Sequence, residues 1–373
     1  MNKQTLAITQ CFPCGSWLSI EKITDKLSDR KHKIQILGYG SPQTRRKDQK
    51  YYLIPYLPYN RFGYITCYSP LLGIIWNLPL FVASLILLVS LRPDTTIYNG
   101  LGTGLLLSPV VKFLGGKNII MYHSTIRDVG TTTKKIVRYL MSYVDMIVVN
   151  SKGSELDIAD TVGSDKIVVN HHFAAHEYFK YGKKKGNLHE SLNVLYVGRI
   201  DKDKHCFPLM DYIAKKKGDK KFQFTFAGAG SEMKKIKDLA LTYPNVKFLG
   251  YIEDKSSLSK LYRDADLVWA FADTTYLALP AVEALACDTP IIVPKYAAIA
   301  GRKELIIKDL VPKQIGWLVD PFKSKEIESL MDRIQQNKEY MEKRCFEYAV
   351  KHYSSQNLLE TVKIVERIID KKI

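Results

Sequence analysis

Two cations, Arg199 and Lys204, stand five residues apart in the segment VGRIDKDK, just after an apolar run that is typical of a β-strand. Loops at the carboxyl ends of parallel strands line the ligand crevice of open α/β sheets. A pair of fixed cations in such a loop suits a diphosphate, because a guanidinium binds phosphate oxygens bidentately. Taken alone, an ordinary surface cation pair is the simpler interpretation. The segment is therefore a candidate anion site that needs support from other residues.

A second anion-binding pattern lies in TTYLALPAVEALACDTPIIVP, residues 274–294. Pro280 suits the first turn of a helix, whose free N–H groups favour a bound anion. Glu283 follows one turn later, where its carboxylate could accept hydrogen bonds from two hydroxyls of a ribose, although a lone helical glutamate is more often solvated or a cap. Between the two patterns, Gly228 and Gly230 in FAGAG allow a backbone to approach a ligand closely.

Metal and redox sites are weaker hypotheses. Cys11 and Cys14 have C-x-x-C spacing, but no second pair completes a zinc site. The pattern D-x-D occurs at 201–203, between the candidate diphosphate cations, and at 264–266, at the start of a predicted strand. A polar loop explains the remaining candidate ligands better than a metal site does: His171, His172 and His176. We expect no bound metal.

The elements that must position these residues form two β-α series. The first alternates buried strands with helices up to KIVVNHH, residues 166–172, and predicts a doubly wound parallel sheet. A polar, lysine-rich stretch at 178–192 is typical of a linker between domains. A second series runs from NVLYVGRI, residues 193–200, to PIIVP, residues 290–294, and helical periodicity follows from Ser324. The predicted domains are 1–180, 190–355 and a C-terminal helix, 356–373, that packs back on the first domain.

These pieces, in this order, resemble the family 4 retaining glycosyltransferases, group 1 enzymes of the GT-B fold that move a sugar from a nucleotide donor. The resemblance extends over nearly the whole chain, from PCGS at 13–16 to LPAVEALACDTPIIVP. It implies an α/β fold of two Rossmann-like, doubly wound domains facing a central cleft, with the C-terminal helix crossing back to the first. The implied activity is hexosyl transfer from a UDP- or GDP-sugar, with no cofactor required.

The resemblance also implies roles for residues at the donor. Arg199 and Lys204 would neutralise the donor diphosphate, Glu283 would bind its ribose, and Gly15 and Ser16 would close on the diphosphate from the first domain. Cleavage of the anomeric bond leaves growing negative charge on the nucleoside diphosphate, so preorganised cations and a helix N-terminus stabilise the transition state more than the ground state.

Three further positions follow from the same resemblance. Ile252, with Tyr251 beside it, would lie at the donor base. His123, in MYHS, would lie at the reacting centre as the catalytic residue. A histidine at the end of a strand is by itself more often structural than catalytic, and the family context reverses that preference.

The sequence departs from the family pattern at the loop for the donor sugar and phosphate. The family usually has a glutamate eight residues before the second one, and Thr275 stands there, with Asp273 nearby. The usual aromatic and glycine pair is replaced by Leu277 and Ala278, and Cys14 takes the place of one loop glycine. The predicted loop residues are Thr275, Tyr276, Leu277, Ala278 and Leu279. The donor sugar is therefore expected to be unusual, with Thr275 or Asp273 substituting, or the activity to be weak.

Charge leaves alternatives open. The 373 residues include 55 Lys and Arg against 38 Asp and Glu, and the formal net charge of +17 indicates a phosphate-bearing ligand, nucleic acid or anionic membrane. The lysines are spread over predicted helices without the aromatic and basic repeat of a nucleic-acid reader, so we expect no nucleic-acid partner. A basic nucleic-acid-binding protein is the weaker alternative, and a nucleotide-sugar-binding or epimerase-like GT-B protein without transfer is another.

Two segments favour an acceptor linked to a membrane, such as a lipid-linked glycan or glycolipid. Residues 70–91 form an uncharged run long enough to span a bilayer, but Asn77 and Pro79 should break its helix, which favours a buried or interfacial element. Residues 45–64 alternate cations with aromatics, which suits a headgroup region, and an ordinary long loop with a solvated face is the alternative. Four of these cations are candidates for an anionic membrane face: Arg45, Arg46, Lys47 and Lys50. No apolar leader follows Met1, so we expect a cytoplasmic protein and consider peripheral binding to the inner face of the membrane.

Overall fold

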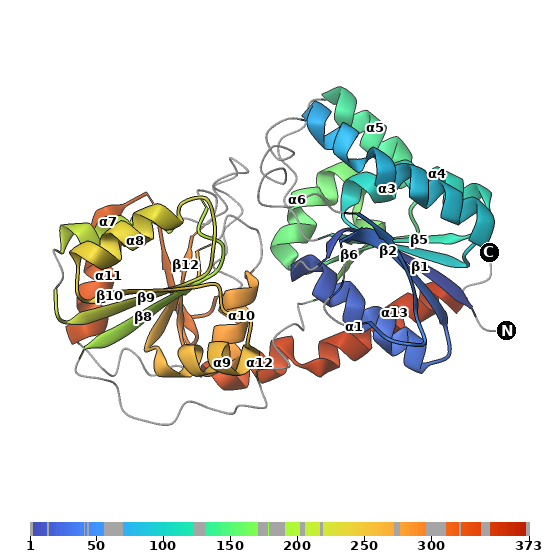
Figure 1. Cartoon of the computed structure of the whole chain (residues 1–373). Helices are drawn as coiled ribbons and strands as arrows, with labels where there is room; N and C mark the ends of the chain where they lie inside the picture. Colours follow the sequence, from blue (N-terminus) through green and yellow to red (C-terminus); the bar gives the residue numbers. More distant parts are fainter. Residues whose placement is uncertain are drawn as a thin grey trace. The chain divides into compact units, whose positions relative to one another are not determined.

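The computed structural model divides the chain into two compact units, shown in Figure 1. Unit 1 comprises Met1–His171 and Gln356–Ile373, and unit 2 comprises His172–Ser355. The structure describes residues 3–12, 15–40, 42, 45–55, 70–122, 131–170, 178, 191–201, 206–216, 219–271, 277–295, 311–320, 322–336 and 344–370. Most of the predicted linker lies outside these residues.

Unit 1 is built on a seven-stranded parallel sheet with the order β3-β2-β1-β4-β5-β6-β7. Its strands are β1 (Gln4–Phe12), β2 (Lys33–Gly40), β3 (Lys50–Ile54), β4 (Thr95–Asn99), β5 (Lys117–Tyr122), β6 (Met146–Val149) and β7 (Ile167–Val169). The order reverses between β1 and β4, which pair in register from Thr5 opposite Thr95. In such sheets ligands bind outside the carboxyl ends of the strands at this switch point.

Helices cover both faces of this sheet, and Figure 1 shows α1 and α13 on the side opposite α3, α4 and α5. The helices of unit 1 are α1 (Gly15–Asp29), α3 (Pro70–Leu91), α4 (Leu101–Phe113), α5 (Thr131–Met141), α6 (Lys152–Val162) and α13 (Ser355–Asp370), with a 3₁₀ turn at Ser164–Lys166. Gly15 and Ser16 therefore lie at the start of α1, next to the switch point.

The C-terminal helix α13 crosses back to unit 1. It buries an apolar face that includes Val362 and Val365, both with no exposed area. At its edges, Arg30 pairs with Glu366, and the Lys3 Nζ donates a hydrogen bond to the backbone oxygen of Ile369 at 3.1 Å. The helix thus completes the core of the first unit from the far end of the chain.

The long helix α3 contradicts the expectation that Pro79 ends it. The helix is continuous from Pro70 to Leu91. A proline disturbs the hydrogen-bond ladder of a helix locally, and here the backbone N–H of Leu80 donates to the Tyr39 hydroxyl of β2 at 3.2 Å. The sheet thus supplies an acceptor at the disturbed turn. Within the described part of the chain, no helix has the combination of length and hydropathy that crossing a bilayer requires.

Unit 2 repeats the architecture with a six-stranded parallel sheet of order β10-β9-β8-β11-β12-β13. Its strands are β8 (Leu192–Val197), β9 (Phe222–Ala227), β10 (Val246–Gly250), β11 (Leu267–Trp269), β12 (Ile291–Pro294) and β13 (Gly316–Val319). Its helices are α7 (Phe207–Lys215), α8 (Met233–Thr242), α9 (Lys255–Asp264), α10 (Leu279–Ala286), α11 (Ser324–Gln336) and α12 (Cys345–Tyr353). The switch point lies between β8 and β11.

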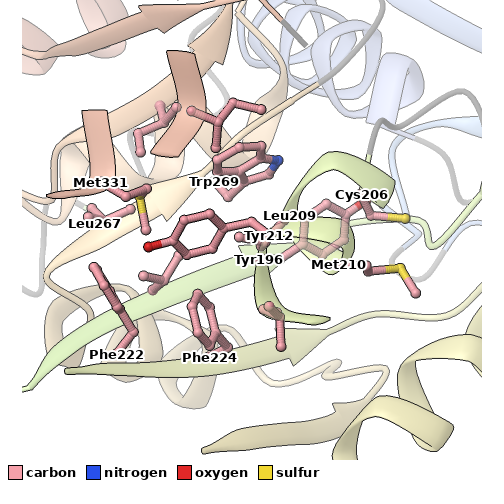
Figure 2. Packing of buried hydrophobic residues seen from close by; sticks show 14 of the residues in the cluster. Tyr196, Cys206, Leu209, Met210, Tyr212, Phe222, Phe224, Leu267, Trp269 and Met331 are labelled. Atoms are coloured by element: carbon pink, nitrogen blue, oxygen red, sulfur yellow. The ribbon is translucent and has the colours of Figure 1, made fainter. Parts of the chain in front are cut away.

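Aromatic side chains fill the core of unit 2 on one face of its sheet (Figure 2). Phe222 and Phe224 stack with ring centroids 5.9 Å apart, and Tyr212 from α7 meets Phe222 edge to face at 5.9 Å. Trp269 stacks on Phe271 at 4.1 Å. Aromatic pairs add specific geometry to the large area that they bury, so this core fixes the strands from which the candidate site projects.

Candidate active site

Two glycine-containing loops close on each other at the carboxyl ends of β8 and β9. Gly198 N donates to Ala227 O at 3.0 Å, and Ile200 N donates to Ala229 O at 3.0 Å, so the ladder continues beyond the strands. A Cβ added to Gly228 would lie 1.8 Å from the Gly198 oxygen. Gly228 also has φ +150°, a conformation that favours glycine. The glycine at this position is required by backbone packing inside the protein.

The loop after β8 holds Arg199 in a fixed place. Its Nη1 donates to Asp201 Oδ2 at 2.5 Å, and the Tyr196 hydroxyl donates to its backbone oxygen at 2.6 Å. Asp201 is buried, and its other oxygen accepts from the Ser231 N–H at 2.8 Å and hydroxyl at 2.9 Å. The Arg199 side chain is 47% exposed. It is thus an anchored cation that keeps about half of its side-chain area exposed to solvent.

Helix α10 follows the neighbouring strand β11, and Pro280 stands in its first turn as predicted. Strands β8 and β11 pair, with Leu195 opposite Val268, so their carboxyl ends are adjacent. The loop that carries Arg199 and the N-terminus of α10 therefore leave the same edge of the sheet at its switch point. A cation and the positive end of a helix dipole at one edge favour a bound anion.

The carboxylate of Glu283 lies one turn inside α10 and is half buried. The hydroxyl of Tyr262 on α9 donates to Glu283 Oε2 at 2.8 Å. Tyr262 has no exposed area, and both this burial and the neighbouring carboxylate raise the pKa of Tyr262 well above its ordinary value. The phenol thus stays protonated and donates. Tyr178 meets the Tyr262 ring edge to face, with centroids 6.0 Å apart.

The segment after β10 is tied to the same edge. Gly228 N donates to Gly250 O at 2.7 Å. Tyr251 follows with 69% of its area exposed, and Ile252 is half buried. The structure therefore places these two residues beside the glycine loops of β8 and β9.

The other predicted site residues divide into described and undescribed ones. Leu277 is buried, Ala278 is the N-cap of α10 with extended backbone, and Leu279 begins that helix. Gly15 and Ser16 belong to α1 of unit 1. Four predicted residues lie outside the described ones: His123, Lys204, Thr275 and Tyr276. Among the described residues, no group of three or more His, Cys, Asp or Glu gathers as a metal site would need.

Two residues of this site were missed in the sequence. Asp201 was considered only as part of a D-x-D pattern, and it anchors Arg199. Asp201 stands two residues after Arg199, and this spacing could have predicted the ion pair. Nothing in the sequence pointed to Tyr262, because its spacing of 21 positions from Glu283 is not one that a helix or a turn brings into contact.

Comparisons with known proteins bear on the family and the fold. Residues 179–352 match the family model described as glycosyl transferases group 1. HepE from Anabaena in complex with UDP has a TM-score of 0.73 at 14% identity, covering 98% of this chain and 99% of its own; HepE was also solved with UDP-glucose, with a TM-score of 0.65. A sequence search of curated proteins finds no match.

Two other solved structures are similar over nearly their whole length. Sucrose-phosphate synthase from Thermosynechococcus elongatus has a TM-score of 0.75 at 17% identity, covering 98% of this chain and 99% of its own. The lipopolysaccharide outer core galactosyltransferase WaaB has a TM-score of 0.65 at 14% identity, covering 97% and 99%.

Residues 179–352 form a group 1 glycosyltransferase domain, and the chain as a whole has the GT-B fold. The predictions of two Rossmann-like domains and of a glycosyltransferase domain are thereby confirmed. Membership of family 4, retention of configuration and the roles of single residues stay predictions for this glycosyltransferase.

Proposed function

We propose that this glycosyltransferase moves a hexose from a UDP-sugar, with retention of the anomeric configuration, to a hydroxyl of a membrane-linked glycan or glycolipid. The observation that carries the donor proposal is the edge of the unit 2 sheet that holds the anchored Arg199 next to the N-terminus of α10 with Glu283. HepE, which has the same fold, was solved with UDP and with UDP-glucose. A GDP-sugar is the donor alternative.

Each residue of this edge has a role that follows from its chemistry. Arg199 and Lys204 balance the charge that grows on the diphosphate as the anomeric bond breaks, and the dipole at the N-terminus of α10 adds to this effect. Glu283 accepts hydrogen bonds from the two ribose hydroxyls. The family resemblance adds that Tyr251 and Ile252 would lie beside the base.

The remaining roles in the proposal come from the family resemblance. Gly15 and Ser16, at the start of α1, close on the diphosphate, and His123 acts at the reacting centre. The loop from Thr275 to Leu279 meets the donor sugar and phosphate. No metal or cofactor takes part in this proposal.

The proposal is tested by incubating the full chain with a panel of UDP- and GDP-sugars and lipid-linked or soluble glycan acceptors. Nucleotide release and the anomeric configuration of the product, followed by NMR, are the measurements. We expect release of UDP and a product with retained configuration. Binding without transfer would favour a nucleotide-sugar-binding protein, an inverted product would contradict retention, and an epimerised donor would favour the epimerase-like alternative.

Tyr262 is expected to position Glu283 for the donor. Loss of one hydrogen bond to a half-buried carboxylate costs about 1.5 kcal/mol, so Tyr262→Phe should weaken UDP binding about tenfold. We expect the donor KM to rise by the same factor while kcat changes little, because the ribose contact is made equally in the ground and transition states. Isothermal titration calorimetry and initial rates are the measurements.

Tyr212→Phe is the matched control for this prediction. Tyr212 is also buried in unit 2, and its hydroxyl has no hydrogen-bond partner among the described residues. Its removal should leave UDP affinity unchanged. Equal affinities in both variants would show that Tyr262 does not position Glu283.

A further inference from the structure

Exposed apolar side chains gather along one face of α3. Leu78, Val82, Ile86 and Val89 are 46–62% exposed and follow each other at helical spacing. The opposite side of the same helix is buried at Leu80, Ser84 and Leu88, with no exposed area. The part of the uncharged run from Asn77 to Leu91 is therefore split lengthwise, with one side in the core of unit 1 and the other in solvent.

The two helices beside α3 continue this surface. On α4, Leu106 and Phe113 are 58% and 90% exposed; on α5, Ile136 and Tyr139 are 54% and 64% exposed. The three helices α3, α4 and α5 lie together on one side of the unit 1 sheet (Figure 1), with α4 in contact with both others. Eight of the fourteen large apolar residues that are exposed in the described part of the chain belong to these helices, which makes the apolar character a property of one face.

The charges of this face are of one sign. The sequences of α3, α4 and α5 contain no Asp or Glu. Their cations are Lys112, Lys134, Lys135 and Arg138, of which Lys135 and Arg138 are exposed next to Ile136 and Tyr139. An amphipathic surface that joins large apolar side chains to cations, without anions, has the chemistry of helices that lie at the boundary of headgroups and acyl chains.

We propose that the outward face of α3, α4 and α5, called here the three-helix face, docks on the surface of a bilayer that contains anionic phospholipid. The apolar side chains enter the acyl boundary, and Lys135 and Arg138 meet the lipid phosphates. A second copy of the chain would bring cations against cations across the same face, whereas anionic headgroups complement them. The inference deepens the proposed function and rests on it for the membrane-linked acceptor.

Of the four cations at 45–50 that are candidates for a membrane face, Arg46 is engaged within unit 1. Arg46 lies against carboxylates of its own unit, at 2.9 Å from Asp29 and 2.7 Å from Asp48, and 4.0 Å from Asp25. Its charge is thus compensated within the protein. The cations of α5 lie next to exposed apolar side chains, and the three-helix face is the better membrane contact of the two.

Flotation of the full chain with vesicles tests this proposal. The probes are vesicles of phosphatidylcholine alone and of phosphatidylcholine mixed with phosphatidylglycerol. We expect binding to the mixed vesicles at low salt, and a reduction of about tenfold or more in the partition coefficient for the double variant Val82→Asp/Ile86→Asp, because two apolar side chains lose their burial and gain charge. Leu241→Asp is the matched control, since Leu241 is 87% exposed on α8 of unit 2.

Several results would overturn the proposal. The first is that the wild-type protein does not bind the mixed vesicles. The second is that the double variant and Leu241→Asp lose vesicle binding equally. The third is a concentration-dependent dimer in light scattering that the double variant abolishes. Far-UV circular dichroism and thermal unfolding establish that the variants fold. UDP affinity separates the two proposals, because the double variant should keep it: a chain that binds vesicles but no nucleotide sugar contradicts the proposed donor alone.

Discussion

Glu283→Ala is expected to lower the affinity for UDP about a hundredfold or more. A carboxylate that accepts two hydroxyls contributes about 1.5–3 kcal/mol for each hydrogen bond, and every 1.4 kcal/mol is a factor of ten in affinity. The substitution also leaves the Tyr262 hydroxyl without its acceptor in a fully buried position. This second effect lowers the stability of unit 2 in the free and the bound protein alike, so the loss of affinity comes from the ribose contact. Isothermal titration calorimetry with UDP is the measurement.

Two variants make this result specific. Glu283→Gln keeps an acceptor oxygen for Tyr262 and for one hydroxyl, so its loss should be smaller than that of the alanine. Glu328→Ala removes a carboxylate of α11 that pairs with Lys215 at 2.6 Å on the surface of the same unit, and it should leave UDP affinity unchanged. If a folded Glu283→Ala variant bound UDP as tightly as the wild type, Glu283 would not bind the ribose.

The second large effect is expected on stability. In Gly228→Ala the new Cβ would lie 1.8 Å from the oxygen of Gly198, and φ of +150° is unfavourable for alanine. The obstacle is backbone, so it cannot rotate away. Relief requires the two loops to separate and to lose the bonds from Gly198 N to Ala227 O and from Ile200 N to Ala229 O. We expect the free energy of unfolding to fall by about 3 kcal/mol or more, or unit 2 not to fold at all.

Gly102→Ala is the matched control. Gly102 lies in α4, and its Cβ would meet nothing within 4 Å. Alanine should stabilise this helix by about 0.5–1 kcal/mol, because glycine loses more backbone freedom on folding. Differential scanning calorimetry of both variants gives the comparison. A Gly228→Ala protein with wild-type unfolding would show that the close packing of the two loops is not needed.

Much of the fold was predictable because buried parallel strands and their covering helices have strong patterns. The two β-α series, the helix that begins at Pro280 and the glycine loops all follow from local sequence. The tertiary hydrogen bonds were not predictable, because Tyr262 with Glu283 and Leu80 with Tyr39 join residues that only the tertiary fold brings together. Which side of α3 is exposed was equally hidden, since an uncharged run looks the same whether one side or both sides are covered.

The return of α13 to unit 1 has a consequence for how the protein is made. The first unit leaves the ribosome early, but Val362 and Val365, which belong to its core, are synthesised only after the whole of unit 2. Until then the nascent first unit exposes the apolar surface that these side chains later cover, and such surfaces favour aggregation. Unit 2 is therefore synthesised, and can fold, before unit 1 is complete. The unit whose synthesis starts first is thus the last to be finished.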